Sequence, residues 1–275
     1  MLKRFRSPFH GLTANSALLA EGRDLRLPHL TYLIVFVPRS SSTRLTHLLR
    51  APGQYGDPEE WFSTEILRAH APVFGAACTR DYIDQLCRRC NQAGVFGAEV
   101  TWLQMRRLCR ETTFLATLKP QKLIWLIRQD IVAQAVSAVR MVQTGISQSI
   151  LVDRQTRTEG KDRHHCDAAA IRHRLRMLSF EEDRGEAMVA RANLPLLRLS
   201  YEQLVGAADS LVLTRISGFL GRPQPDGSPV PDIGHERLSG ARSLEFAERF
   251  RREYPRMMAK LDRKRAARLS ALDRL

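Results

Sequence analysis

The sequence has few cysteines, and their arrangement excludes two common uses. Five cysteines occur among 275 residues, and an odd number at irregular spacing does not suit a disulfide framework. Cys87 and Cys90 form a lone C-x-x-C pair, whereas a zinc site would need a second pair or histidines at ligand spacing. The other candidates, His164, His165 and Cys166, lie far along the chain. We therefore predict helix-borne structural thiols and no bound metal.

Long hydrophobic runs are also absent. No segment of the sequence reaches the roughly 18 apolar residues of a membrane span. Residues 1–30 are polar and basic and lack the apolar core of a signal peptide. These features predict a flexible basic N-terminal extension over residues 1–30, a single domain over residues 31–275 and a cytoplasmic protein.

Acidic residues are few relative to basic ones. The chain has 43 lysines and arginines against 29 aspartates and glutamates, which gives a net charge of +14 and a pI of about 10.3. This balance favours anionic partners, namely nucleotides, nucleic acid or an acidic membrane surface. A solvated basic surface without a partner explains the charge equally well.

Four apolar runs are typical of buried strands, and each is followed by a segment with helical spacing of its apolar residues. This alternation predicts an α/β protein with a parallel sheet flanked by helices. We predict a surface loop or lid over residues 146–170, irregular structure over 221–234, and a basic helical segment over 243–275. The predicted strands cover residues 31–37, 94–102, 122–128 and 194–200. A helix is predicted after each strand. The first helix begins at Ser42 or Thr43 and ends near Arg50, and the second ends near Glu111. The third spans residues 131–144, and the fourth ends near Leu220.

The turn after the first predicted strand carries the sequence PRSSST, residues 38–43. Amide groups at the start of a helix lack partners within the helix, and the helix dipole adds partial positive charge there. Arginine and hydroxyl side chains complete a set that suits phosphate or sulfate. The turn lacks the glycines and lysine of a Walker A loop, so a magnesium-dependent NTPase is not expected. A turn with serine caps and a surface arginine fits this stretch equally well.

Further segments occur with PRSSST in an order that resembles the trehalose sulfotransferase family. They are APGQYGDPEEWF at 51–62, GVFGAEVTWLQ at 94–104, LIWLIRQDIVAQAVSAVRMVQTG at 123–145 and LRLSYEQL at 197–204. The resemblance covers residues 32–255, and its most specific part is residues 128–144. It implies a P-loop-like sulfotransferase fold, 3′-phosphoadenosine 5′-phosphosulfate (PAPS) as donor, a hydroxyl of a carbohydrate or glycolipid as acceptor, and no metal. A homodimer is implied by the resemblance alone.

The resemblance also implies roles for individual residues. Arg128 and Ser137 are expected to hold the 3′-phosphate of the donor, because a guanidinium and a hydroxyl can grip one phosphate together. The alternative for Arg128 is a surface arginine that pairs with Asp130. The expected loop for the 5′-phosphosulfate consists of Arg39, Ser40, Ser41, Ser42 and Thr43.

The residues of the acidic motif DPEEWF are expected to bind the acceptor and to accept its proton. Glu60 resembles the family's general base, which takes the proton of the acceptor hydroxyl. Asp57 and Glu59 are expected to bind acceptor hydroxyls. The alternative for these acids is an exposed helix N-terminus, where negative charge is favoured. Trp102 is either a core aromatic residue or a platform for a sugar ring.

Three positions depart from the family pattern. Ser41 and Glu99 occupy positions where the family usually has a glycine and a lysine. Ser147 lies near a position where the family usually has a tryptophan. If Glu99 is ionised ~6 Å from the donor sulfate, the repulsion is roughly 3 kcal/mol at an effective dielectric constant of ~20. These departures motivate an alternative, in which the protein binds a nucleotide or another anion without turnover.

The basic residues of 243–275 motivate two further hypotheses. One is a nucleic-acid-binding protein, although no helix-turn-helix, zinc finger or aromatic RNA-binding motif supports it. The other is an enzyme whose C-terminal segment contacts an anionic membrane near a lipid-linked acceptor.

Overall fold

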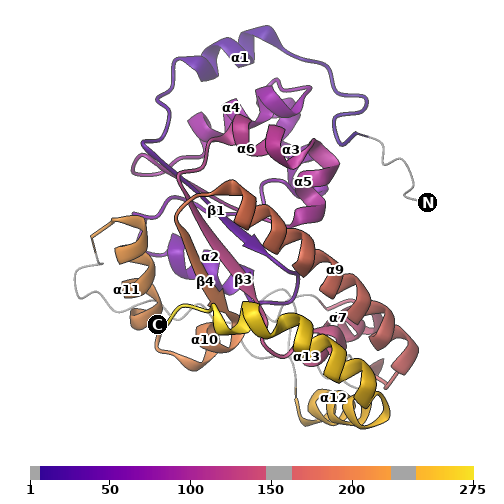
Figure 1. Ribbon diagram of the computed structural model, residues 1–275. Coiled ribbons are helices and arrows are strands. Elements are labelled where there is room, and N and C mark those ends of the chain that lie inside the picture. The colour runs from indigo at the N-terminus through magenta and orange to yellow at the C-terminus, as the bar shows by residue number, and fades with distance from the viewer. Residues whose placement is uncertain (1–6, 147–162, 224–239) are drawn as a thin grey trace.

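A four-stranded parallel sheet forms the centre of the computed structural model, which describes residues 7–146, 163–223 and 240–275 (Figure 1). The strand order is β2-β1-β3-β4, and all three pairings are parallel. The predicted α/β fold with a parallel sheet is therefore confirmed, and the four strands lie at the predicted places. The strands are β1 (Leu30–Phe36), β2 (Val95–Val100), β3 (Lys122–Ile127) and β4 (Leu196–Ser200).

Both faces of the sheet are buried, which explains why the strands read as continuous apolar runs. All seven residues of β1 are buried. Leu33 and Val35 contribute to one hydrophobic cluster, and Tyr32 and Ile34 contribute to a second cluster. Because side chains alternate along a strand, the two clusters lie on opposite faces of the sheet.

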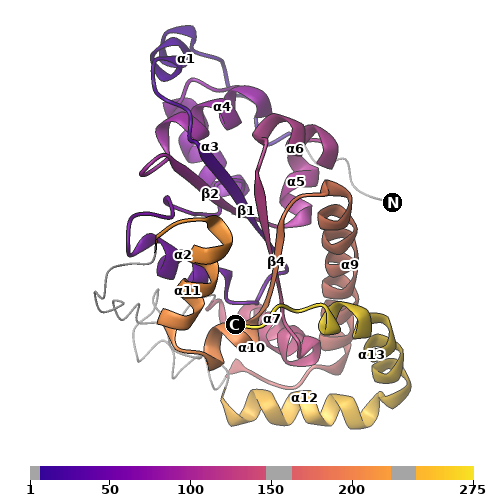
Figure 2. The same cartoon turned by 60° about the vertical axis from the view of Figure 1, so that its left-hand side comes forward.

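Helices cover each face, and Figure 2 shows the sheet between the two layers. One face is covered by α2 (Ser42–Arg50), α10 (Tyr201–Gly206) and α11 (Asp209–Leu220). The other hydrophobic cluster includes residues of most remaining helices. These helices are α3 (Thr64–Val73), α4 (Thr79–Arg89), α5 (Trp102–Leu108), α6 (Glu111–Leu118), α7 (Ile131–Thr144), α9 (Ala168–Ala192), α12 (Ala241–Glu253) and α13 (Pro255–Ser270).

The N-terminal residues differ from the flexible extension that the sequence suggested over residues 1–30. From residue 7 onward they are folded against the rest of the protein, and residues 1–6 lie outside the described residues. Phe9 packs into the core, and α1 (Ser16–Arg23) packs against α4. Asn15 caps α1 by accepting hydrogen bonds from two amides of its first turn.

The C-terminal basic segment forms two helices, α12 and α13, because the chain turns at Tyr254 and a proline follows. α12 packs against α7. Most of the predicted irregular segments, over residues 147–162 and 224–234, lie outside the described residues. The described end of the first irregular segment already belongs to α9, which begins at Ala168.

Gly185 of α9 allows that helix to approach β3 closely, and this generates a first prediction. A Cβ atom at Gly185 would lie 2.3 Å from the ring of Trp125. Gly185→Ala should therefore lower the free energy of unfolding by about 1–3 kcal/mol through overpacking. Urea denaturation followed by circular dichroism measures the change.

Gly218→Ala is the matched control, because Gly218 lies in α11 and a Cβ atom there would meet nothing within 4 Å. It should raise the free energy of unfolding by up to about 1 kcal/mol, since alanine favours the helix. Equal effects of the two substitutions would show that the packing of Gly185 on Trp125 is not tight.

Candidate functional site

The loop after β1 has an unusual backbone that positions the start of α2. Arg39 and Ser41 both have positive φ angles, 69° and 66°, in the left-handed region that favours glycine. Gln134 of α7 fixes the loop by donating a hydrogen bond of 2.7 Å to the Pro38 carbonyl. The N-cap residue is Ser41, whose side chain caps no amide, and Ser42 is the first helical residue. The prediction that Ser42 or Thr43 caps this helix is therefore wrong.

The predicted arginine and serine residues of β1, β3 and α7 meet at the carboxyl ends of neighbouring strands. Arg39 donates from Nε to the Ser137 Oγ, at 3.2 Å. Burial lowers the pKa of Arg39, and the charges of Arg128 and Arg140 lower it further. Two further guanidinium groups thus lie close enough to Arg39 to act on its charge, and Ser137 contacts Arg39. Such an arrangement favours a bound anion.

Arg128 is only 5% exposed, so it is not the surface arginine of the alternative interpretation. Its guanidinium lies 4.1 Å from the centre of the Tyr201 ring, and its Nε lies 3.8 Å from Glu202 Oε1. Asp130, the partner proposed in that interpretation, forms an ion pair with Arg251 of α12. Tyr201 and Glu202 therefore hold Arg128 at the end of β3.

Arg140 is a residue of this cluster that the sequence reasoning missed. It is 5% exposed, and burial lowers its pKa. Its neighbour His164 has a pKa lowered to about 4 by burial and by the charges of Arg140 and Arg242, so its ring is neutral. Arg140 follows Ser137 by three residues on α7, which puts both on one side of the helix. That spacing was the signal that could have identified it.

The acidic motif lies beside the end of β2. The Glu59 carbonyl accepts a hydrogen bond of 2.9 Å from the Glu99 amide, which fixes the segment to the sheet. Arg50 of α2 forms ion pairs with Asp57 and Glu59. The acids precede α3, whose first turn contains Glu65 and whose N-cap is Ser63. The alternative that they mark a helix N-terminus is therefore wrong.

Glu60, the predicted general base, is held by one strong hydrogen bond. Its Oε1 accepts from Gln104 Nε2 at 2.6 Å. Gln104 is itself fixed, because it completes a capping box with Thr101 at the start of α5. Burial raises the pKa of Glu60, the hydrogen bond from Gln104 opposes this, and the charge of Glu59 adds to the rise. A partly buried carboxylate with a raised pKa is suited to accept a proton near neutral pH.

Glu99 lies at the end of β2, on the face of the sheet that α2 covers. It is 2% exposed, and its carboxyl group lies close to Ser42. Burial raises the pKa of Glu99 to about 8, with contributions from Glu60 and Glu59. The group is thus largely protonated at pH 7, so the charge repulsion that the sequence suggested does not apply there.

Trp102 has contacts away from Glu60. Its indole Nε1 donates to Glu111 of α6, and its ring contacts Phe180 of α9 edge to face, at 5.5 Å between centroids. The side chain packs against the core. These contacts favour the interpretation of Trp102 as a core aromatic residue.

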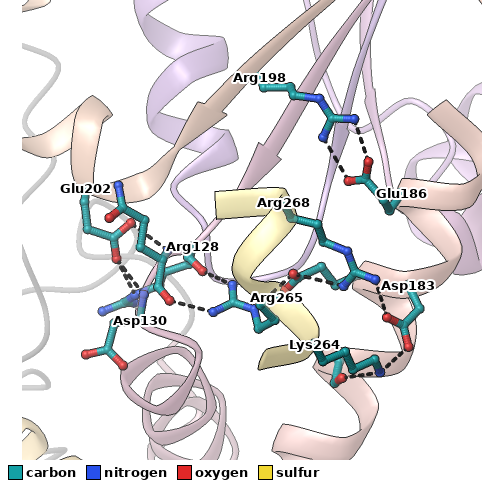
Figure 3. A network of polar contacts seen from close by, with 12 residues as sticks. Arg128, Asp130, Asp183, Glu186, Arg198, Glu202, Lys264, Arg265 and Arg268 are labelled. Atoms are coloured by element: carbon teal, nitrogen blue, oxygen red, sulfur yellow. Dashed lines mark hydrogen bonds and ion pairs between the residues drawn. The ribbon is translucent and has the colours of Figure 1, made fainter. Parts of the chain in front are cut away.

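The C-terminal helix α13 supports the turn that carries Arg128, as Figure 3 shows. Arg265 donates to the carbonyl groups of Arg128 and Gln129. It also pairs with Glu182 of α9 at 3.0 Å, and both side chains are at most 3% exposed. Lys264 and Arg268 of α13 pair with Asp183. Several basic residues of the C-terminal segment therefore neutralise acids of the same chain.

Across residues 7–146, 163–223 and 240–275, no group of three or more histidine, cysteine, aspartate or glutamate side chains is placed to hold a metal ion. Within the same ranges, no helix has the length and apolar character needed to cross a membrane. A cavity of about 1180 Å³ lies at the amino ends of the strands, lined by Thr31 and Gln121 among others, and is separate from the cluster at their carboxyl ends.

Comparison with known proteins identifies the family. The profile of the Stf0 sulphotransferase family matches residues 31–253, most of the chain. The protein belongs to the Stf0 sulphotransferase family. The resemblance that the sequence motifs indicated is thereby confirmed.

Proteins that resemble this Stf0 family member include two trehalose 2-sulfotransferases and one solved sulfotransferase structure. A trehalose 2-sulfotransferase of Mycolicibacterium smegmatis is 30% identical over 267 residues, which cover 82% of this chain and 96% of the relative. A trehalose 2-sulfotransferase of Mycobacterium tuberculosis is 26% identical with the same coverage. The crystal structure of a sulfotransferase from Alicyclobacillus acidocaldarius has 14% identity, a TM-score of 0.44, and matches 83% of this chain and 93% of that one.

The support of the Arg128 turn in this Stf0 sulphotransferase generates a second prediction. Arg265→Met should lower the free energy of unfolding by about 3 kcal/mol, because it leaves the buried Glu182 carboxylate with less compensation and two carbonyl groups without their donor. Chemical denaturation measures the loss. Arg263→Met, on the exposed side of α13, is the control and should change stability by less than about 0.5 kcal/mol. Similar values for both variants would contradict a supporting role of Arg265.

Proposed function

We propose that this protein transfers the sulfuryl group of PAPS to a hydroxyl group of a carbohydrate or glycolipid. The observation that carries the proposal is the cluster of Arg39, Arg128 and Arg140 at the carboxyl ends of β1 and β3. Clustered guanidinium groups are suited to charge-assisted hydrogen bonds with an anion, such as the phosphate groups of an anionic nucleotide. Membership of the Stf0 family supports the reaction, and trehalose 2-sulfotransferases among the relatives support a trehalose-like acceptor.

The donor would bind across the two strand ends. The loop from Arg39 to Thr43 would hold the 5′-phosphosulfate through hydroxyl groups and the first amides of α2. Ser40 suits this role, since its hydroxyl group is fully buried and makes no hydrogen bond with any described residue. Arg128, Ser137 and Arg140 would hold the 3′-phosphate.

The acceptor hydroxyl would approach from the side of Glu60. As its oxygen forms a bond to sulfur, its proton moves to the Glu60 carboxylate, and the bond between sulfur and the phosphate oxygen breaks. The products are a sulfate ester and adenosine 3′,5′-bisphosphate. Positively charged and hydroxyl groups of the loop would stabilise the charge that develops on the leaving phosphate. Asp57 and Glu59, held by Arg50, would contact other hydroxyls of the acceptor.

A second candidate function is nucleotide binding without turnover, and the carboxyl group of Glu99 beside Ser42 is the observation that favours it. The two functions share the nucleotide site and differ in whether sulfated product forms. The hypothesis of nucleic-acid binding receives no support from α13, where Lys264, Arg265 and Arg268 pair with acids of α9.

The nucleotide site gives a third prediction. Calorimetric titration with adenosine 3′,5′-bisphosphate should show micromolar binding to the wild type. Arg140→Met should weaken it by tenfold to about a hundredfold, because one charge-assisted interaction contributes roughly 1.5–3 kcal/mol. Arg128→Met should have a similar effect.

Arg256→Met, exposed on α13, is the control and should bind the nucleotide as the wild type does. If the wild type binds no nucleotide, or if Arg140→Met and Arg128→Met bind with unchanged affinity, the arginine cluster does not form the donor site.

The general base gives a fourth prediction. Glu60→Gln should lower kcat for sulfation of trehalose by about 10²–10⁴-fold and leave the affinity for adenosine 3′,5′-bisphosphate unchanged. Because Glu60 must be ionised and its pKa is raised, kcat of the wild type should fall as the pH decreases through this raised pKa. Transfer of labelled sulfate measures the rate.

Glu65→Gln, on the exposed side of α3, is the matched control and should retain full activity. Equal rates for Glu60→Gln and the wild type would contradict the assignment of the base. Nucleotide binding by the wild type without any sulfated product would favour the second candidate function.

A further inference from the structure

Two buried polar groups without hydrogen-bond partners lie beside the loop that begins α2. Glu99 Oε2 makes no hydrogen bond with any described residue, and neither does Ser40 Oγ. Both side chains are almost completely buried. The Glu99 carboxyl group also lies close to Ser42, the first residue of α2. Buried polar atoms are normally satisfied, so these atoms indicate that a polar ligand completes this region.

The charges around Glu99 disfavour a carboxylate at this position. The segment before α3 places Glu59 and Glu60 close enough to raise the pKa of Glu99. From α2, Ser42 and Arg50 act in the opposite direction. The guanidinium of Arg50 is already paired with Asp57 and Glu59. An anionic ligand at the start of α2 would add further negative charge.

We propose that Glu99 binds the donor as a neutral carboxylic acid, with its O–H donating a hydrogen bond to an oxygen of the anionic group at the start of α2. The inference rests on the proposed function and identifies a further donor-binding residue. No proton is transferred, because Glu99 keeps its proton throughout the reaction while Glu60 accepts that of the acceptor. The unpartnered Oε2 of Glu99 then acquires the partner that the described residues do not provide.

Proton-dependent binding follows from this assignment. The pKa of Glu99 is raised to about 8, so the neutral form is present below that pH and is lost above it. If only the neutral form binds, the apparent Kd rises with the fraction of ionised Glu99 and is about tenfold larger at pH 9 than at pH 7. Phosphate groups of the nucleotide lose their last proton near pH 6. His47, the nearby histidine of α2, has a lowered pKa and is neutral throughout this range.

The experiment is a calorimetric titration of adenosine 3′,5′-bisphosphate into the wild type, Glu99→Gln and the control Glu65→Gln, at pH 7, 8 and 9. The wild type and Glu65→Gln should lose about tenfold in affinity between pH 7 and 9. Glu99→Gln, whose amide remains a donor, should bind with equal affinity at all three values. In the wild type at pH 8.5, the binding enthalpy should also depend on the ionisation enthalpy of the buffer, because binding takes up a proton.

The outcomes separate this inference from the proposed function. Nucleotide binding with the same pH dependence in the wild type and Glu99→Gln overturns the role of Glu99 and leaves the donor site intact. Absence of binding in all three proteins overturns the donor site and this inference together. If Glu99→Gln does not fold, the wild type alone decides, since a binding enthalpy independent of the buffer at pH 8.5 overturns the proposal.

Discussion

The turn that follows β3 is the constraint on which the candidate site depends, because it buries Arg128 at the end of the strand. The turn is held from two sides. Glu202 of α10 accepts hydrogen bonds from the amides of Gln129 and Asp130, at 2.8 and 3.1 Å, and Arg265 of α13 donates to the carbonyl groups on the opposite side. Burying a charged guanidinium costs free energy, so without both supports the side chain of Arg128 would favour exposure to solvent. The last helix of the chain thereby fixes a residue more than one hundred positions earlier.

The charges of the site are separated around the start of α2. Arg128, after β3, and Arg140, on α7, lie near Arg39, after β1, and the carboxyl groups of the segment before α3 lie near Glu99 of β2. A donor with two anionic groups and an acceptor that must lose a proton require this kind of separation. Because parallel strands bring their carboxyl ends to one edge, the sheet produces it from segments that are far apart in sequence.

The sequence was sufficient to predict the strands, since both faces of the sheet are buried and each strand is a continuous apolar run. The helices α3, α4 and α9 were not predicted, and for α4 and α9 polar residues on their buried sides explain this. α9 buries Glu182, which pairs with Arg265 and Arg268, and α4 buries Gln85, which bonds with Leu19 and Arg89. These side chains interrupt the hydrophobic period. Arg140 was overlooked for a related reason, because an arginine on an amphipathic helix is usually exposed. The protonation of Glu99 depends on burial and on neighbours from other segments, which spacing along the chain cannot show.

Two of the three departures from the family pattern differ in their physical consequences, and the third, Ser147, lies outside the described residues. Ser41 replaces a glycine, yet its φ of 66° keeps the left-handed conformation that glycine would adopt, at a cost of roughly 1–2 kcal/mol. The turn therefore adopts a left-handed conformation at Ser41 without a glycine and adds a hydroxyl group at the proposed anion site. Glu99 would reverse a charge if it were ionised, but burial favours the neutral acid, which can donate a hydrogen bond as an ammonium group does. A substitution that appears prohibitive from its formal charge is thus compatible with anion binding, provided that the protein holds the proton.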